Sequence, residues 1–472
     1  MASIPGSQFN ATANGQPVTV VDTTNGSSLP PPVPGTFNLE VWTGPPGSAP
    51  AEPAPGYQGL AILSDGGQEL TLVTGAFAVT DNGTGNDTLN ADGMDETING
   101  GSANVTLNLN GNNDVANGGG QDTITVTGYA DTVNGVGSDV INAFGVDDLI
   151  NPGSGNDTIS VNGFGDTVTA GPGANSILAT GIFEAVTGGI GPDTITATGM
   201  FDTITAGSGA DSLTATGLFD TITAGSGADT MIATGLFDSL TGGTGPETIT
   251  ATGSFDTVVA GSGADSISVS GNFDSVTAGS GSDTISFSGQ FDSLSGGTGP
   301  ETVTATGPFN QIAAGSGADS ITASGNFAVV TGGSGPDTIS VSGEFSAVTG
   351  GSGPDSITAT GSFDTVFAGT GADTINVSGN YDTAQAGTLG STTAALINMS
   401  GTSTTFADGP NTYSDTITGF SQSSGDTIKL SGGNAVATTT PENGGADTKI
   451  TLTDGSTILL KGITHVDSSF FS

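Results

Sequence analysis

The sequence predicts an all-β protein in which most of the chain winds into a parallel β-solenoid. Three observations lead to this fold class. An 18-residue motif recurs through most of the chain of 472 residues, which contains 81 glycines. Short segments within it, such as residues 248–252 (TITAT), alternate apolar and polar side chains, and a glycine-rich corner follows each one. Helices are not expected, because glycine and β-branched residues recur too often and no 3.6-residue periodicity appears.

The repeat consists of two unequal nonapeptides. One has the form (A/G)-G-x-G-x-D-x-U-x, with U aliphatic, as in residues 332–340, and the other has the form x-(T/S)-G-x-F-D-x-U-x, as in residues 251–259. The register holds from residue 382 back to Asp157, and two 17-residue steps precede it between Val105 and Asp139. About seventeen coils therefore fit between residues 82 and 390.

Each coil is expected to supply two strands and two turns, and successive coils to pair in parallel about 4.8 Å apart. In this arrangement Ile249 and Ala251 point inward, whereas Thr248, Thr250 and Thr252 point outward. No coil can bury its apolar face alone, so stability must come from stacking neighbours. The repeats are therefore expected to form one quasi-linear domain.

A carboxylate falls on the same corner of nearly every coil. Like charges about 4.8 Å apart repel by roughly 3.5 kcal/mol at an effective dielectric constant of 20. The chain has only three lysines and no arginine, so counter-cations must come from outside, and Ca²⁺ fits a site of carboxylates and turn carbonyls. The expected carboxylate ligands are Asp87, Asp122, Asp139, Asp157, Asp193, Asp211, Asp229, Glu247, Asp265, Asp283, Glu301, Asp319, Asp337, Asp355 and Asp373, beside turn glycines exemplified by Gly207, Gly209, Gly225, Gly227, Gly333 and Gly335.

The two corners of the coil differ in how strictly they keep their charge. From residue 193 onward every replacement of aspartate on the first corner is glutamate, which argues against acidic residues that only solubilise a turn. On the second corner the series Asp292, Asn310, Ala328, Ser346, Asp364 loses the charge three times in succession. The sequence therefore predicts multiple calcium ions, chiefly in one row along the first corner.

The first nonapeptide resembles the RTX (repeat-in-toxin, haemolysin-type calcium-binding) motif G-G-x-G-x-D-x-U-x, closely so at residues 82–90 and 152–160. The resemblance implies a right-handed parallel β-roll that binds calcium between turns, with the sixth residue supplying a carboxylate and the flanking residues supplying carbonyls. Val105 and Asn175 depart from the motif in the ligand column, as does the Phe-bearing half-repeat throughout residues 183–390. These departures favour one calcium row over the two rows common in that family.

An aromatic residue occupies the second corner of successive coils. Its spacing predicts rings stacked roughly 5 Å apart, in the range where aromatic pairs add stability beyond burial. We interpret the column as an internal ladder that stiffens a metal-free corner, with an exposed edge for partners as the alternative. Its members are Phe183, Phe201, Phe219, Phe237, Phe255, Phe273, Phe291, Phe309, Phe327, Phe345, Phe363 and Tyr381.

Residues 1–81 form the first of three expected domains, ahead of the solenoid at 82–390 and a C-terminal module at 391–472. Eleven of the 21 prolines lie between Pro5 and Pro55, which predicts an extended arm or assembly segment. Two apolar stretches, residues 37–42 and 60–63, are expected to dock as strands over the first coil. Donation of residues 37–42 to a neighbouring molecule is the alternative.

The C-terminal module holds all three lysines and the single histidine, His465. Residues 415–420, 425–430 and 449–460 are expected to be strands, with a hairpin turn at Asp454-Gly455. The module resembles the C-terminal part of RTX proteins exported by type I secretion. The resemblance implies an uncleaved carboxyl-terminal signal, the type I secretion machinery as a partner, and release from a Gram-negative cell.

Composition restricts the functions that this chain can have. A formal charge of −43 excludes nucleic-acid binding, and the absence of cysteine excludes thiol catalysis and disulfides. No apolar run is long enough to insert in a membrane, and no H-E-x-x-H motif precedes the repeats, so no enzyme is expected.

The remaining interpretation is a secreted, calcium-dependent structural protein. It is expected to fold outside the cell and to join copies of itself, laterally or end to end, into a surface layer or matrix filament, with a cell-surface glycan as a further possible partner. An ice-binding or adhesin solenoid is the alternative, suggested by the outward Thr and Ser rows, although these mix the two residues freely. An RTX enzyme or toxin fits least well.

Overall fold

The structure is a computed structural model. It consists of two compact units, Met1–Thr230 and Met231–Ser472. The structure describes residues 85–387, 393–409 and 414–472 continuously. Before residue 85 it describes residues 8–13, 16–22, 31–32, 34, 37–42, 58–63, 69–72 and 77–81. The expected domain boundaries at residues 81 and 390 remain predictions.

Strands of both units alternate between two sheets, here called sheet A and sheet B. In the first unit, sheet A contains β1 (Gln8–Ala13), β2 (Gln16–Asp22), β3 (Phe37–Trp42), β4 (Gln58–Leu63), β6 (Phe77–Asp81), β8 (Thr97–Asn99), β10 (Val115–Asn117), β12 (Thr132–Asn134), β14 (Leu149–Asn151), β16 (Thr167–Pro172), β18 (Ala185–Ile190), β20 (Thr203–Ser208) and β22 (Thr221–Ser226). Sheet B contains β5 (Glu69–Leu72), β7 (Thr88–Ala91), β9 (Thr106–Asn112), β11 (Thr123–Tyr129), β13 (Val140–Val146), β15 (Thr158–Phe164), β17 (Ser176–Ile182), β19 (Thr194–Met200) and β21 (Ser212–Leu218).

The second unit continues the same alternation. Its sheet A contains β24 (Ser239–Gly243), β26 (Thr257–Ser262), β28 (Ser275–Ser280), β30 (Ser293–Gly297), β32 (Gln311–Gly315), β34 (Val329–Ser334), β36 (Ala347–Ser352), β38 (Thr365–Thr370), β40 (Thr383–Gln385), β42 (Thr405–Ala407) and β44 (Thr427–Lys429). Sheet B contains β23 (Thr230–Leu236), β25 (Thr248–Ala251), β27 (Ser266–Val269), β29 (Thr284–Phe287), β31 (Thr302–Ala305), β33 (Ser320–Ala323), β35 (Thr338–Val341), β37 (Ser356–Ala359), β39 (Thr374–Val377), β41 (Leu396–Met399), β43 (Ser414–Thr418), β45 (Val436–Glu442), β46 (Asp447–Leu452) and β47 (Thr457–Leu460).

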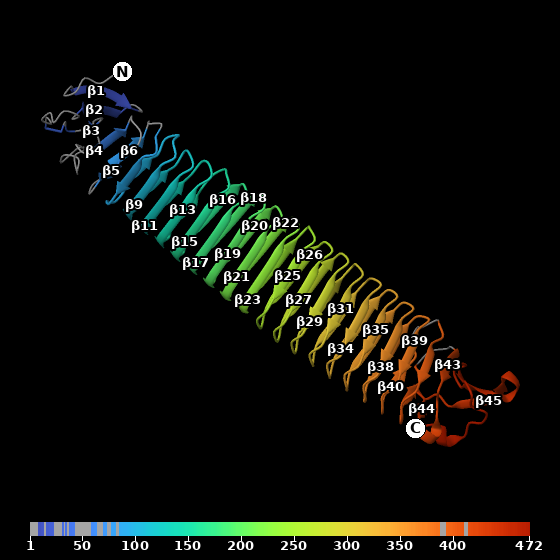
Figure 1. Ribbon diagram of the computed structural model, residues 1–472. Helices are drawn as coiled ribbons and strands as arrows, with labels where there is room; N and C mark the ends of the chain where they lie inside the picture. The colour runs from blue at the N-terminus through green and yellow to red at the C-terminus, as the bar shows by residue number, and fades with distance from the viewer. Residues whose placement is uncertain are drawn as a thin grey trace. The chain divides into compact units, whose positions relative to one another are not determined.

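Parallel pairing between successive coils confirms the predicted parallel β-solenoid and its repeat length (Figure 1). Thr194 pairs with Ser212 in the first unit, and Ala347 pairs with Thr365 in the second. The 17-residue coils also pair in parallel, since Thr123 lies opposite Val140. The right-handed sense of the coil remains a prediction.

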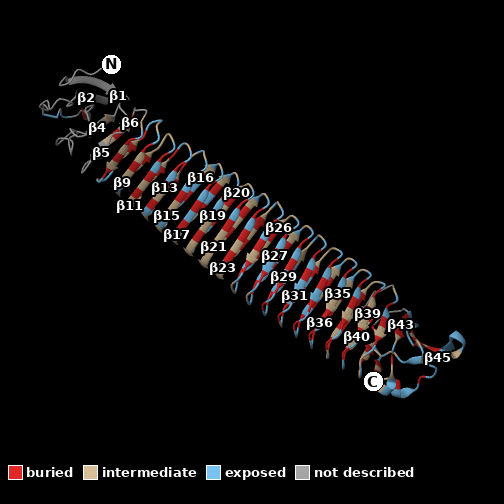
Figure 2. Cartoon of the chain, in the orientation of Figure 1, coloured by how far each residue is buried: buried red, intermediate tan, exposed pale blue. Residues whose placement is uncertain are grey.

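Burial alternates along the strands, as the period-2 pattern predicts (Figure 2). Ile249 and Ala251 are buried, while Thr248 and Thr252 are exposed and Thr250 is intermediate. Inward residues of both sheets are chiefly small aliphatic side chains, so each coil buries little apolar area and depends on the coils beside it.

The segment before residue 82 contains strands that join sheet A. β3 and β4 confirm the strands expected at residues 37–42 and 60–63. β4 pairs in parallel with both β3 and β6, and β6 pairs with β8. β1 and β2, which the sequence did not predict, form an antiparallel hairpin whose second strand pairs with β3. This segment therefore covers the first coils of its own solenoid.

The end of the second unit is a small β cap. β45, β46 and β47 pair antiparallel, β47 runs parallel to β43, and Gly455 in the turn between β46 and β47 has a φ of 93°. The predicted hairpin is therefore confirmed. Among the described residues of this region lie three short 3₁₀ helices, namely η2 (Gln422–Ser424), η3 (Asn443–Gly445) and η4 (Ser468–Phe470).

The carboxyl-terminal residues pack against the cap. Phe470 stacks on Phe420 with ring centroids 5.4 Å apart, and the Ser472 N–H donates to the Ile428 carbonyl at 3.0 Å. The described residues contain no α-helix, and none of their helices is long or apolar enough to cross a membrane.

At the first corner the backbones of successive coils lie so close together that only glycine fits. Gly333 has a φ of 119°, and a Cβ atom added there would lie 1.9 Å from the carbonyl oxygen of Gly315 in the preceding coil. A side chain would therefore be strained by both its φ and its contact. Gly432 also has a positive φ of 64°, but nothing lies within 4 Å of a Cβ added there.

We expect the substitution Gly333→Ala to lower the free energy of unfolding in calcium by more than about 2 kcal/mol, because steric conflict with the Gly315 carbonyl adds to the cost of a positive φ. Gly432→Ala, which has the positive φ without the conflict, should cost only about 1 kcal/mol. Urea denaturation followed by circular dichroism measures both changes. Equal effects of the two substitutions would show that close backbone approach does not constrain the corner.

Candidate metal centre

In each unit the predicted ligand carboxylates lie in a column at the start of sheet B strands, and they are buried. None of the fifteen exposes more than 3% of its surface. Burial was not part of the sequence prediction, which fixed only the corner that they share. Burial adds to the repulsion between the carboxylates, because a buried charge without a partner has a far higher free-energy cost than an exposed one.

One oxygen of most of these aspartates has a partner in the neighbouring coil, whereas Glu247 and Glu301 accept from the N–H groups of Gly245 and Gly297 in their own coils. The Asp193 N–H donates to Oδ1 of Asp211 at 2.8 Å, and the Asp337 N–H donates to Oδ1 of Asp355 at 2.9 Å. Bonds of this kind recur along the column within each unit. Asn175 accepts the same bond through its Oδ1, at 3.0 Å from the Asp157 nitrogen. An amide can therefore replace the carboxylate in this structural role.

The second oxygen of most of these carboxylates has no hydrogen-bond partner. Native structures seldom leave a buried polar atom unsatisfied, so a cation or a proton must complete these sites. Asp122 differs, since its Oδ2 accepts from the Gly119 N–H at 2.8 Å. The oxygens without a partner are Oδ2 of Asp139, Asp157, Asp193, Asp211, Asp229, Asp265, Asp283, Asp319, Asp337, Asp355 and Asp373, and Oε2 of Glu247 and Glu301.

The glycine that opens the motif brings a carbonyl oxygen close to this unpaired oxygen. A Cβ atom added to Gly332 would lie 2.3 Å from Oδ2 of Asp337 and 2.6 Å from the carbonyl oxygen of Gly350 in the next coil. Gly350 repeats the arrangement with Asp355 and the Ala368 carbonyl. A carboxylate oxygen and a carbonyl oxygen from adjacent coils thus converge, which is the donor set that Ca²⁺ prefers.

The described residues contain no group of three or more acidic or histidine side chains that could hold an ion together. An ion at the first corner would therefore take most of its oxygens from turn carbonyls. Of the six glycines predicted to orient those carbonyls, five have a positive φ, and Gly209 lies outside that range. The five are Gly207, Gly225, Gly227, Gly333 and Gly335.

The second corner carries a carboxylate column with the same geometry. Its members expose no more than 2% of their surface, and the Asp256 N–H donates to Oδ1 of Asp274 at 2.9 Å. Oδ2 of Asp256, Asp274 and Asp292 has no partner. The sequence set this column aside because Asn310, Ala328 and Ser346 interrupt it, yet the other members are as buried as those of the first corner. The column comprises Glu96, Asp114, Asp131, Asp148, Asp166, Glu184, Asp202, Asp220, Asp238, Asp256, Asp274, Asp292, Asp364 and Asp382.

Burial raises the pKa of many carboxyls in both columns. On the first corner it raises the pKa of Asp337 and Asp355 to about 6, and that of Glu247 to about 8. N–H donors from the neighbouring coil oppose the rise in Asp337 and Asp355, whereas adjacent carboxylates reinforce it in all three. On the second corner burial raises the pKa of Asp148 to about 7 and that of Glu184 to about 8.

Most of the formal charge therefore lies inside the coils. Between residues 231 and 387, Glu344 is the only acidic residue that is not buried, and this stretch contains no lysine, arginine or histidine. Its outer surface is formed chiefly by Thr, Ser, Asn and aromatic side chains. Cations bound inside the corners would neutralise the buried charge without changing this surface.

The aromatic column is exposed, so the internal ladder expected from the sequence is only half correct. Rings stack as predicted, with centroids 4.7–5.1 Å apart from Phe255 to Tyr381. However, Phe273 is 51% exposed and Tyr381 is 59% exposed. Each ring also sits on a residue with a φ of 60–64°, a conformation that bulky residues rarely adopt.

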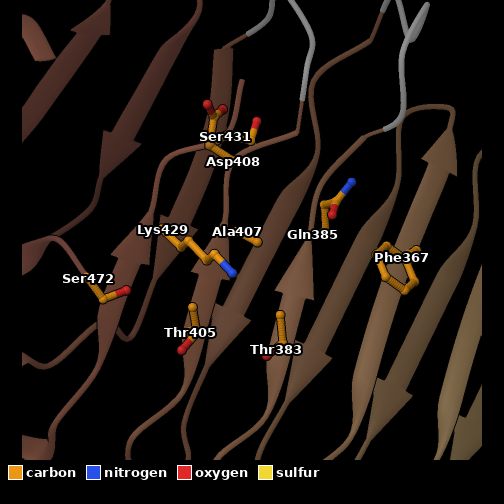
Figure 3. Close-up of a pocket in the computed structure, with 9 residues that line it drawn as sticks. All are labelled: Phe367, Thr383, Gln385, Thr405, Ala407, Asp408, Lys429, Ser431 and Ser472. Carbon is orange, nitrogen blue, oxygen red and sulfur yellow. The ribbon is translucent and has the colours of Figure 1, made fainter. Parts of the chain in front are cut away.

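A pocket of about 450 Å³ lies on sheet A near the C-terminal cap (Figure 3). Lys429 is its only cationic side chain, and burial raises the pKa of Asp408 to about 6. Its lining residues include no histidine and no cysteine, and Asp408 carries their only side-chain carboxyl group. It is formed by Phe367, Thr383, Gln385, Thr405, Ala407, Asp408, Lys429, Ser431 and Ser472.

The fold and the site together define a parallel β-solenoid whose corners are suited to divalent cations. Comparison with protein families identifies these repeats: the model of the RTX calcium-binding nonapeptide repeat matches residues 187–217, 213–240, 241–276, 261–294, 295–326 and 349–384. These segments are RTX repeats, which confirms the resemblance found in the sequence and implies that they bind Ca²⁺. No curated protein and no solved structure gave a significant match.

In EGTA, we expect the protein to be most stable near pH 4 and to lose stability as the pH rises through about 6 to 8. Raised pKa values mean that the folded state binds protons more tightly than the unfolded state, so stability falls as these protons leave. In saturating calcium the trend should reverse between pH 4 and 7, because protons compete with the ion. Thermal melts across pH measure this, and a metal-free stability that rises from pH 5 to 8 would contradict it.

We expect Asp337→Asn to change stability in opposite directions in the two media. In EGTA at pH 7, where the native chain is expected to be largely unfolded, it should move the folding equilibrium toward the fold by about 1 kcal/mol, because it removes a buried charge and keeps an acceptor for the Asp319 N–H. In calcium it should destabilise the fold by about 2 kcal/mol, because an ion loses a ligand. The matched control is Glu344→Gln, which removes an exposed charge nearby and should change neither value. The same sign in both media would exclude a metal role for Asp337.

Proposed function

We propose that this chain is a secreted structural protein that folds on meeting extracellular calcium and then assembles into a surface layer or matrix filament. The observation that carries the proposal is the column of buried carboxylates in each unit, most of them with an oxygen that no protein group satisfies. A fold with this interior requires neutralising ions, and the RTX repeats identify calcium as the ion.

The same column explains how folding would be confined to the outside of the cell. Extracellular modules bind calcium with dissociation constants of about 10⁻⁴ to 10⁻³ M, which cytosolic calcium cannot fill. At neutral pH without the ion, unpaired carboxylates would disfavour the coiled state, and the chain would stay threadable. Outside, ion binding would become folding free energy.

The C-terminal module supports export by type I secretion through its resemblance to the corresponding part of RTX proteins. Its last residues are ordered against the cap, where Phe470 is buried and Ser472 bonds to β44. They would therefore be accessible to an export machine only before the cap folds. A Gram-negative cell surface as the final location forms part of this proposal.

A structural role is favoured over catalysis because about two thirds of the chain, residues 82–390, is built of repeats. The solenoid corners supply carboxylates that ions would occupy, which removes them from acid and base roles. The pocket beside the cap has no paired catalytic groups among its lining residues. The absence of enzymatic activity remains a prediction.

We expect purified protein at neutral pH to gain β-structure and to assemble in millimolar calcium, and to lose both in EGTA. Circular dichroism measures folding and sedimentation velocity measures assembly, while electron microscopy shows whether the product is a sheet or a filament. Magnesium at the same concentration is the control, because its smaller, octahedral shell suits carbonyl-rich corners poorly. A chain that is equally folded and equally dispersed in calcium and EGTA would overturn the proposal.

A further inference from the structure

The second unit carries a continuous strip of exposed aromatic rings, here called the aromatic ladder. It consists of the nine aromatic side chains that recur once per coil from Phe237 to Tyr381. Between 39% and 59% of each residue is exposed. The rings of neighbouring coils lie nearly parallel, with interplanar angles of 3–13°. The ladder therefore presents a regular apolar edge to the outside.

The backbone of the corner does not require an aromatic residue. In the first unit the equivalent corners include Asn113, Ala130, Asp147 and Gly165, with φ values of 59°, 59°, 60° and 77°, as well as Phe183, Phe201 and Phe219. Gly, Asn and Asp tolerate the left-handed region, whereas phenylalanine is strained there. Phenylalanine thus occupies every corner from residue 237 to 363 although less strained residues fit the same turn. The geometry of the turn therefore does not explain why the residue is phenylalanine, and the rings must have another role.

Charge around the ladder restricts the partner that it can receive. The residues that precede the rings are neutral except for Glu344, and residues 231–387 contain no cationic side chain. The other carboxylates of this stretch are buried in the two columns. A strongly charged polymer or protein would find no counter-charge here, whereas a neutral, apolar surface would lose nothing by approaching. The ladder of a second copy is such a surface.

The area available matches the needs of a dimer. An aromatic side chain can bury about 150–250 Å², so nine rings that are about half exposed offer roughly 900 Å². A stable interface of standard size buries about 800 Å² on each partner. Two ladders also share one repeat distance, so equivalent contacts can recur at every coil in a two-fold arrangement that places the same strip on both copies.

We propose that the aromatic ladder of the second unit is the surface through which two copies of this chain associate side by side. This inference deepens the proposed function, on which it rests, by assigning the lateral contact to named residues. The calcium corners would stabilise each copy, and the aromatic corner would join the copies. Folding and assembly would thus depend on different edges of the coil.

The test compares the full chain with a triple variant, Phe273→Asn, Phe291→Asn and Phe309→Asn, in millimolar calcium. Asparagine suits the positive φ of these corners, as Asn113 shows, so the variant should keep the circular dichroism spectrum of the native chain. The control carries Ser286→Asn, Thr304→Asn and Thr322→Asn, which replace exposed residues in register on sheet B of the same unit. Sedimentation equilibrium measures the association of each protein.

We expect the ladder variant to raise the dissociation constant of the dimer at least 100-fold, and the control to change it less than threefold. The chain has no cysteine, so a single Asn326→Cys substitution beside the ladder gives a unique site for a spin label. Labels there should lose mobility on dimerisation, and labels on a Thr304→Cys variant should not. Folded ladder variants that associate as tightly as the native chain, or a native chain that folds yet stays monomeric, would overturn the inference.

The two proposals can fail separately in this experiment. Association that survives loss of the rings would refute the ladder while leaving calcium-dependent assembly intact. Folding that is indifferent to calcium, combined with a ladder variant that no longer dimerises, would refute the calcium-dependent function while supporting the ladder.

Discussion

Neutralisation of buried carboxylate oxygens is the constraint on which the rest of this structure depends. Most coils of each unit place carboxylates inside their corners, and in coils such as those of Asp211 and Asp355 one oxygen receives an N–H from the neighbouring coil while the other lacks a protein partner. Parallel stacking brings these groups within one coil of each other, so the backbone pairing that builds the sheets also concentrates the charge. The aliphatic core is thin, and it cannot by itself offset several unpaired anions. Stability is therefore tied to whatever occupies the corners.

Because the carboxylates are buried, the net charge of the chain and the charge of its exposed surface differ. A chain with a formal charge of −43 would be expected to repel copies of itself, yet residues 231–387 expose a single carboxylate, that of Glu344. Ions in the corners act within a copy, and the outer face meets other molecules as a nearly neutral surface. Net charge computed from composition is thus a poor guide to how this protein meets its surroundings.

Much of the fold could be predicted from the sequence because contacts in a solenoid join equivalent positions of successive repeats. The alternation around Ile249 and Ala251 identified the inward face, and the regular carboxylates identified the first column. Burial of Asp256 and Asp274 on the second corner was missed, because the sequence shows the loss of charge at Asn310 but not the geometry of the intact coils. Exposure of the rings was missed because a regular period fixes their spacing and not the direction in which they point. The β1–β2 hairpin lies outside the repeat, so no periodicity could reveal it.

On the first corner the hydrogen bond from one aspartate to the next recurs in most coils, and this regularity bears on how such a gene can change. Loss or duplication of one such coil would bring together two partners that already match in register, with the same N–H donor and carboxylate acceptor. Unequal recombination within repetitive DNA would therefore yield shorter or longer proteins without creating a defective junction. Selection could then adjust the number of coils in whole steps, independently of the chemistry within each one.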